Sequence, residues 1–154
     1  MFEHLGAMKS KSPRLAVRAL ILDEDRLLIV NAYAGQKSDL WCAPGGGVEA
    51  GASLTQNLAR EVEEELGAKI EVGQPCLINE FHDPRTGFHQ VEVFFRCKMV
   101  EGPKEGWRDA EGVVNRHRFV TRNELATLRH KPDSLAATAW GIGPLYDPLE
   151  VIVL

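Results

Sequence analysis

The pattern of apolar and polar positions predicts strands at the start of the chain. Residues 14–22 and 26–31 are aliphatic and β-branched runs on either side of the turn-forming triplet 23–25, so they predict a β-hairpin. A short apolar piece, 40–43, then leads directly into a glycine-rich loop. Trp41 therefore lies beside that loop, where its ring can stack on a ligand base or pack in the core, the commoner use of a single Trp.

A helix is predicted over residues 54–66, directly after this loop. Ser53 and Gln56 fit a capping box, and Gly67 suits the left-handed conformation that ends a helix. At about 100° per residue, apolar and polar side chains separate into two arcs. These arcs hold Leu58, Ala59, Val62 and Leu66, and Asn57, Glu61, Glu64 and Glu65. We expect the first arc to pack and the second to present carboxylates.

The second half of the chain predicts more strands, arranged around turn sequences, and two further helices. The predicted elements are two strand-like pieces within 69–81, a turn over 83–87, a strand over 88–100, a strand over 113–120, a helix from Thr121 to about His130, and a short helix around 134–140. The turn over 83–87 predicts a long hairpin. The pattern leaves open whether the apolar end, 150–154, forms a strand or faces a partner.

Composition and charge limit the classes of protein. The 154 residues are 44% hydrophobic and 26% charged, which predicts one domain over 1–154, with 1–13 as a loosely ordered N-terminal segment. A net charge of -4 argues against a binder of nucleic-acid duplexes. No run resembles a signal peptide or membrane span, so we expect a cytoplasmic protein, and a homodimer is the default assembly.

The three cysteines, Cys42, Cys76 and Cys97, are odd in number and widely spaced. They include no Cys-x-x-Cys pair, the pattern typical of zinc ligands or a redox dithiol. We therefore expect free thiols that are buried or partly buried.

The candidate chemistry lies on the acidic arc of the predicted helix. Glu61, Glu64 and Glu65 stand three and four residues apart, where like charges destabilise an isolated helix by roughly a few tenths of a kcal/mol per pair. Such a set suits Mg²⁺, which prefers oxygen ligands, and a carbonyl of Gly45 or Gly46 can complete it. A solvated acidic face is the alternative, but the adjoining glycine loop favours a metal site. A Ca²⁺-binding surface is disfavoured, because no EF-hand spacing is present.

The stretch from Gly46 to Ala68 resembles the Nudix box. The box reads Gly, five residues, Glu, seven residues, then Arg-Glu-aliphatic-any-Glu-Glu-any-Gly-aliphatic, and the matching positions here are Gly46, Arg60, Glu61, Val62, Glu64, Glu65 and Gly67. Two positions depart from the box, because Ala52 replaces the first Glu and Ala68 is the final residue. The resemblance implies the α/β (α+β) class, with an α-β-α sandwich around a mixed β-sheet.

The resemblance also implies a Nudix-type pyrophosphohydrolase. Its members cleave a pyrophosphate bond in a nucleoside diphosphate linked to another moiety, with Mg²⁺ as cofactor and Mn²⁺ as an alternative ion. Carried over by position, Glu61, Glu64 and Glu65 would ligate the metal and Arg60 would orient the glutamates. In that family water attacks phosphorus, which is chemistry that needs positioning and charge neutralisation.

The general base stays open, because the family draws it from different places. Glu61 is one candidate. Asp109 or Glu111, in the loop after Trp107, is another, and Glu92 on the long hairpin is the third.

The alanine at position 52 opens an alternative function. In the family, the first Glu mainly supports the Arg of the box, so Glu64, four residues beyond Arg60, is the expected remaining partner. A non-catalytic Nudix-fold protein that binds or senses a nucleotide is therefore the alternative to the hydrolase.

Three residues outside the box are predicted to contact a small nucleotide-type substrate. Trp41 can stack on a base and Arg18 can contact phosphate. Pro84 stands sixteen positions beyond Ala68, where a proline resembles the ADP-ribose-cleaving group, although the turn sequence also explains it.

Overall fold

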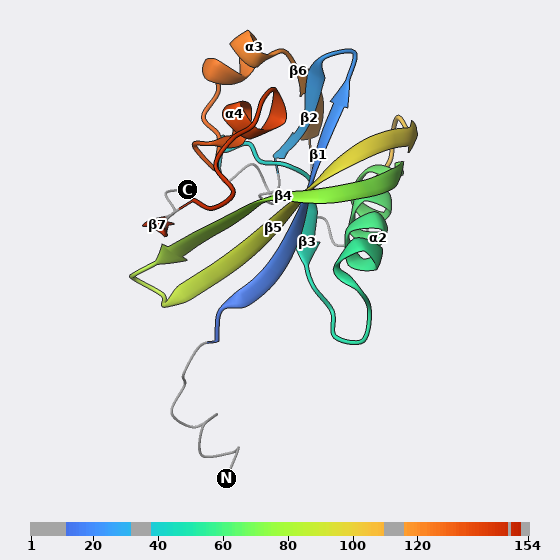
Figure 1. The fold of residues 1–154 in the computed structure, drawn as a ribbon. Helices are drawn as coiled ribbons and strands as arrows, with labels where there is room; N and C mark the ends of the chain where they lie inside the picture. Colours follow the sequence, from blue (N-terminus) through green and yellow to red (C-terminus); the bar gives the residue numbers. More distant parts are fainter. Residues whose placement is uncertain (1–11, 32–37, 110–115, 148, 152–154) are drawn as a thin grey trace.

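The computed structural model describes residues 12–31, 38–109, 116–147 and 149–151. They build a seven-stranded mixed sheet in the order β6-β2-β1-β5-β4-β7, with β3 paired to β1 (Figure 1). The elements are β1 (Arg14–Asp23), β2 (Arg26–Asn31), β3 (Gly45–Gly47), α2 (Leu54–Leu66), β4 (Lys69–Asp83), β5 (Phe88–Glu101), β6 (Arg116–Val120), α3 (Arg122–Ala126), α4 (Leu135–Ala139) and β7 (Glu150–Val151).

The strand pairing confirms both predicted hairpins. β1 and β2 pair antiparallel next to their tight turn, with Asp23 opposite Arg26. β4 and β5 form the long antiparallel hairpin, whereas β1 runs parallel to β5 and β7 runs parallel to β4. The parallel pairing brings the start of the chain beside β5, so that Ala16 lies opposite Glu92.

One prediction about β4 was wrong. The two strand-like pieces expected within 69–81 are a single strand, whose pairing with β5 shifts register between Val72 and Leu77. Pro75 has no N–H to donate to the sheet, and the irregularity lets the strand pass this residue without ending.

The core forms two layers, one on each face of the sheet. Along β1, Val17 and Ala19 pack toward α2, while Leu20 packs toward α3 and α4. The same division separates neighbours on β5, where Phe95 belongs to the α2 layer and Phe94 to the other. Because side chains alternate between the faces of a strand, this pattern gives the α-β-α sandwich that the sequence predicted.

Helix α2 begins and ends where the sequence predicted. Gln56 N–H donates to Ser53 Oγ, and Ser53 N–H donates to the Gln56 side chain, which completes the capping box. Gly67 takes the left-handed conformation, with φ 60° and ψ 36°. Leu58, Val62 and Leu66 of the apolar arc are buried against the sheet, whereas Ala59 is only partly buried.

Helix α3 is shorter than predicted. It ends at Ala126 rather than near His130, because the following backbone pairs with the segment that precedes the glycine loop. Trp41 N–H donates to Arg129 O, and Lys131 N–H donates to Trp41 O. These long-range bonds replace the helical bonds of another turn.

Other expectations are met within the described residues. Helix α4 lies in the predicted range, and the apolar end contributes the short strand β7, although 152–154 lie outside the description. The predicted strand over 113–120 appears as β6, whereas 113–115 also lie outside it. All three cysteines are free and partly buried, as predicted. Among the described helices, none has the length and apolar character to span a membrane.

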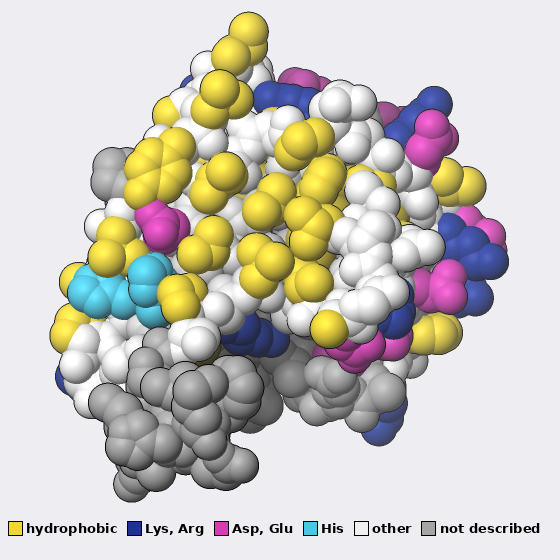
Figure 2. All heavy atoms as spheres, turned by 60° about the horizontal axis from the view of Figure 1, so that its bottom comes forward, with side chains coloured by type: hydrophobic (Ala, Val, Ile, Leu, Met, Phe, Trp, Pro, Cys, Tyr) yellow, Lys and Arg dark blue, Asp and Glu magenta, His cyan; other side chains and the backbone are white. Residues whose placement is uncertain are grey.

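Apolar side chains remain exposed on part of the surface. Figure 2 shows one face on which hydrophobic side chains gather while charged groups lie mainly to one side. In the described part of the chain, several exposed apolar residues belong to the C-terminal segment: Ile142, Leu145, Tyr146, Leu149 and Val151. This segment runs along the edge of β4, where Ile78 N–H donates to Leu145 O.

Candidate functional site

The glycine strand β3 and helix α2 bring their functional groups together. β3 pairs with β1, which places Gly46 opposite Val17 and beside the acidic arc of α2. A Cβ at Gly46 would lie 2.5 Å from Glu61 Oε2, so the glycine leaves room for this carboxylate in its present position. A larger residue at position 46 would have to displace the Glu61 carboxylate.

Glu65 is the most unusual carboxylate of the site. The residue is only 7% exposed, and its Oε1 has no hydrogen-bond partner among the described residues. Burial raises the pKa of the Glu65 carboxyl to about 9, and the Glu61 and Asp109 carboxylates act in the same direction. Arg18 and the hydrogen bond from the Gly45 N–H lower it in part. The positive charge near Glu65 is thus too small to stabilise its ionised form fully.

The three predicted ligands do not occupy equivalent positions. In the described residues, no three His, Cys, Asp or Glu side chains converge as a chelating group. Glu61 and Glu65 influence each other electrostatically, whereas the Glu64 carboxylate lies 3.2 Å from Arg60 Nη1 and its side chain is 41% exposed. The metal role of all three, and a carbonyl contribution from Gly45 or Gly46, stay predictions.

Arg60 links the acidic residues of α2. Its Nη1 lies 3.2 Å from Glu61 Oε1 and from Glu64 Oε2, so the expected pairing with Glu64 forms. Its Nη2 donates to Asn57 Oδ1 at 2.9 Å, a contact that we did not predict. The only sequence signal for Asn57 was its place on the acidic arc.

A buried ion pair lies next to this group. Arg18 Nε lies 2.5 Å from Glu92 Oε2, and Arg18 Nη1 donates to Ala43 O at 3.2 Å. Asn79 and Gln90 also donate to the Glu92 carboxylate. Because these partners occupy both oxygens of Glu92, its geometry favours holding Arg18 over accepting a proton.

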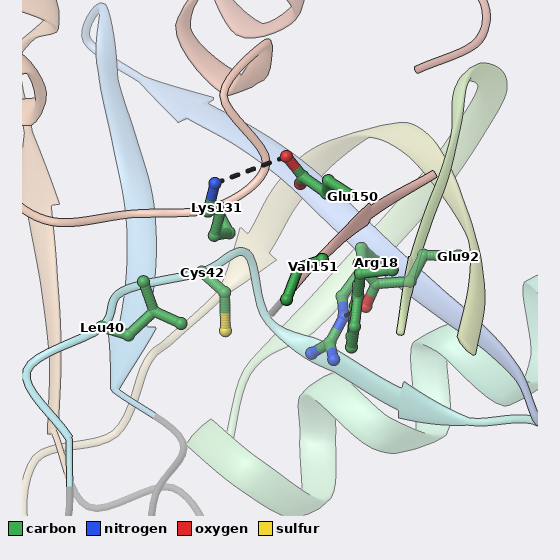
Figure 3. A pocket seen from close by; sticks show the side chains of 8 residues that line it. Arg18, Leu40, Cys42, Glu92, Lys131, Glu150 and Val151 are labelled. Atoms are coloured by element: carbon green, nitrogen blue, oxygen red, sulfur yellow. Dashed lines mark hydrogen bonds and ion pairs between the residues drawn. The ribbon is translucent and has the colours of Figure 1, made fainter. Parts of the chain in front are cut away.

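Arg18 and Glu92 face a small pocket that is open to solvent (Figure 3). Its lining residues are Arg18, Leu40, Cys42, Phe81, Glu92, Lys131, Glu150 and Val151. Lys131 Nζ lies 3.4 Å from Glu150 Oε2, which joins the segment after α3 to β7. The pocket thus combines two ion pairs, Arg18 with Glu92 and Lys131 with Glu150, with an apolar wall. The sequence alone did not single out Lys131.

The loop after β5 closes over the end of α2. The Trp107 indole N–H donates to Glu64 O at 2.8 Å, and Lys104 N–H donates to Leu66 O at 3.1 Å. These bonds satisfy carbonyls that the helix end leaves unpaired. The same loop carries Asp109 close enough to Glu65 to affect its pKa.

The remaining predicted site residues lie away from this group or outside the description. Trp41 is 7% exposed in the core layer of α3 and α4, and the Arg116 guanidinium carbon lies 5.2 Å from its ring centroid. Pro84 is exposed in the turn between β4 and β5. Glu111 lies outside the described residues. Substrate contacts by Trp41 and Pro84 stay predictions.

Comparison with known proteins agrees with this arrangement. A "Putative ADP-ribose pyrophosphatase YjhB" of Bacillus subtilis (strain 168) is 29% identical over 132 residues, which cover 81% of this chain and 60% of that protein. An ADP-ribose pyrophosphatase of Methanocaldococcus jannaschii is 25% identical over 118 residues, covering 75% of this chain and 66% of that protein. The matched part of this chain therefore spans about two thirds or less of the length of these curated relatives.

The fold itself matches solved structures. A NUDIX hydrolase from Nitrosomonas europaea superimposes with a TM-score of 0.70 at 21% identity, over 80% of this chain and 84% of that one. An ADP-ribose pyrophosphatase from Streptococcus suis gives 0.63 at 21% identity, over 92% of this chain and 100% of that one. The family model described as NUDIX domain matches residues 12–141. The glycine strand, the capped acidic helix and the sandwich around them thus place this chain in the NUDIX family.

Proposed function

We propose that the protein hydrolyses the pyrophosphate bond of a nucleoside diphosphate linked to another moiety, with ADP-ribose as the first candidate and Mg²⁺ as cofactor. The observation that carries this proposal is the buried Glu65 carboxylate, which lies near Glu61 and the pocket residue Arg18. One of its oxygens has no partner in the part of the chain that the structure describes. The names of the two curated relatives support the substrate class.

Glu61 and Glu65 fit a divalent cation. A buried carboxylate oxygen without a partner is costly, and hard cations such as Mg²⁺ or Mn²⁺ are bound through such oxygens. Glu64, on the same face, would be the third ligand. When bound, the ion supplies charge neutralisation at the phosphate oxygens and lowers the pKa of a bound water.

The chain itself would position the other reacting groups. Arg60 pairs with the carboxylates of both Glu61 and Glu64 and would fix their positions relative to each other. Arg18, fixed by Glu92, presents a guanidinium to the pocket, where it can bind a phosphate oxygen.

The pocket suits the organic part of such a substrate. Leu40, Phe81 and Val151 provide apolar surface for a base or sugar. Lys131, which is paired with Asp133 and Glu150, adds an ammonium that can donate to hydroxyl groups. Its position next to Arg18 would align the pyrophosphate with the acidic face of α2.

We place Glu61 first among the candidates for general base. Its carboxylate lies against the glycine strand and near Glu65, where an attacking water would be held. Asp109 is the second candidate, because it also influences Glu65 from the loop that covers the end of α2. Glu92 ranks lower, since its oxygens already accept hydrogen bonds.

A substrate panel tests the reaction. The protein would be incubated with Mg²⁺ and ADP-ribose, other nucleoside diphosphate derivatives, and nucleoside triphosphates, and products would be resolved by chromatography. We expect ADP-ribose to yield AMP and ribose 5-phosphate. Turnover of triphosphates alone would contradict the substrate class.

Glutamine substitutions test the site. Glu61→Gln, Glu64→Gln and Glu65→Gln should each lower kcat/KM about 100-fold or more, because metal ligands supply several kcal/mol of transition-state stabilisation. Glu63→Gln is the matched control, since Glu63 is exposed on the same helix and should keep wild-type activity. Near-normal turnover by the Glu65 variant would remove this residue from the site.

The alternative is a nucleotide sensor of the same fold, favoured by the alanine at position 52. The same panel distinguishes the two, because a sensor would show ligand-induced thermal stabilisation with no product. Product formation by the wild-type protein would exclude a purely binding role.

A further inference from the structure

The Asn57 side chain is buried in the first turn of α2, with 1% of the residue exposed. Its Oδ1 accepts the Glu49 N–H and Arg60 Nη2, each at 2.9 Å. Its Nδ2 donates to Ser53 O at 2.8 Å and lies 3.3 Å from both Glu49 O and Ala52 O. One amide thus joins the loop after β3 to the helix and to Arg60.

We propose that Asn57 is a positioning residue for the acidic face of α2, because it fixes Arg60 and Arg60 in turn fixes Glu61 and Glu64. Arg60 Nη1 is within 3.2 Å of both carboxylates. This inference rests on the proposed function, in which these carboxylates bind the divalent cation.

The alanine at position 52 explains why the Asn57 amide holds Arg60 in this protein. Ala52 has no side-chain acceptor, and its carbonyl is already a contact of the Asn57 amide. The Glu49 carboxylate is a weak substitute, since its side chain is 74% exposed and lies 3.8 Å from Arg60 Nη1. The Asn57 amide is closer, is shielded from water, and is itself held at several points.

The two ends of the guanidinium have different partners. Asn57 holds Arg60 Nη2 by a hydrogen bond, which leaves Arg60 Nη1 for Glu61 and Glu64. Partners that orient metal-binding side chains typically contribute about 10- to 100-fold to metal affinity or activity. The effect of Asn57 should therefore appear in cation affinity and not only in stability.

The first test measures Mg²⁺ alone by calorimetry, with thermal unfolding of the metal-free protein in parallel. Asn57→Ala should weaken Mg²⁺ binding about 10-fold or more. Asn57→Asp keeps the acceptor for Arg60, so its Mg²⁺ affinity should stay within about threefold of wild type. Its Tm should fall, because the carboxylate cannot donate to the loop carbonyls.

A rescue experiment tests the route through Arg60. In the Asn57→Ala background, Ala52→Glu should restore much of the Mg²⁺ affinity, since position 52 is exposed and a carboxylate there can pair with Arg60. Ser53→Ala is the control, because it removes the cap of the same helix turn without a side-chain contact to Arg60. It should lower Tm and leave Mg²⁺ affinity unchanged.

Several results would overturn the inference. If Asn57→Ala lowers Tm as Ser53→Ala does but binds Mg²⁺ normally, Asn57 has a structural role only. If that variant fails to fold, a tenfold loss of affinity in Asn57→Asp would contradict the proposal instead. Wild-type protein that binds Mg²⁺ without hydrolysing any substrate would overturn the proposed function alone, whereas absence of Mg²⁺ binding would overturn both.

Discussion

At the scale of single residues, the site depends on charges that the fold removes from water. Glu65 is buried, and one of its oxygens has no partner within the described segments. Arg18, which is held by Glu92, only partly offsets the cost of ionising Glu65. A buried carboxylate without full compensation favours its protonated form. We therefore expect Glu65 to release its proton when a divalent cation binds.

The buried Glu65 predicts a pH dependence of stability in buffer that contains a chelator. The folded protein keeps a proton that the unfolded chain releases above its ordinary pKa of 4.5, so the unfolding free energy should fall as pH rises from about 4.5 to about 9. Glu65→Gln has no ionisable group at this position. Its unfolding free energy, measured by urea titration, should therefore change less with pH than that of the wild-type protein. Glu63→Gln should keep the wild-type profile. Parallel profiles for wild type and Glu65→Gln would contradict the assignment.

At the scale of elements, helix α2 is held at both ends by different devices. Its start is satisfied by local capping from Ser53, while its end is satisfied by the loop that carries Trp107. Gly67 serves both the left-handed turn and close contact, because a Cβ there would lie 2.7 Å from the Trp107 ring. The site on α2 thus depends on a loop about forty residues further along.

Gly67→Ala should destabilise the protein more than Gly106→Ala. Both glycines have positive φ, 60° and 71°, so each alanine incurs about 1–2 kcal/mol of backbone strain. Only Gly67 adds a clash with Trp107, since no atom lies within 4 Å of a Cβ at Gly106. Urea unfolding measures the difference. In a Trp107→Ala background the two substitutions should cost the same, and a persistent gap would refute the steric explanation.

At the scale of the whole molecule, the sheet connects two core layers and the pocket. The α2 layer supports the acidic face, and the α3 and α4 layer supports the Lys131 side of the pocket. Both layers are built on β1 and β5, whose parallel pairing spans Arg14 to Ile21. We therefore expect the layers to unfold together.

Phe94→Ala and Phe95→Ala test this coupling. The two side chains are buried on opposite faces of β5, and each loss should cost about 3–5 kcal/mol. In both variants, Trp fluorescence and far-ultraviolet circular dichroism should report one coincident unfolding transition. Separate transitions in either variant would show that the layers unfold independently.

Much of the fold was predictable because its signals are local. The limits of α2 follow from Ser53, Gln56 and Gly67, and the β1–β2 hairpin follows from two apolar runs around one tight turn. The α3 end was not predictable, since it depends on pairing between Trp41 and His130. Local propensity extends over a few residues, whereas that bridge joins segments far apart in the chain.

The sequence by itself determined the acidic arc, the glycine-rich stretch before it and the family resemblance, because spacing along one helix decides which side chains share a face. That the glycines form the strand β3 emerged only from the structure. Only the tertiary structure decided which carboxylate is buried, that Asn57 holds Arg60, and that Arg18 pairs with Glu92 across 74 positions. These features depend on strand register and on the residues that pack over each side chain. The spacing of a motif specifies neither of them.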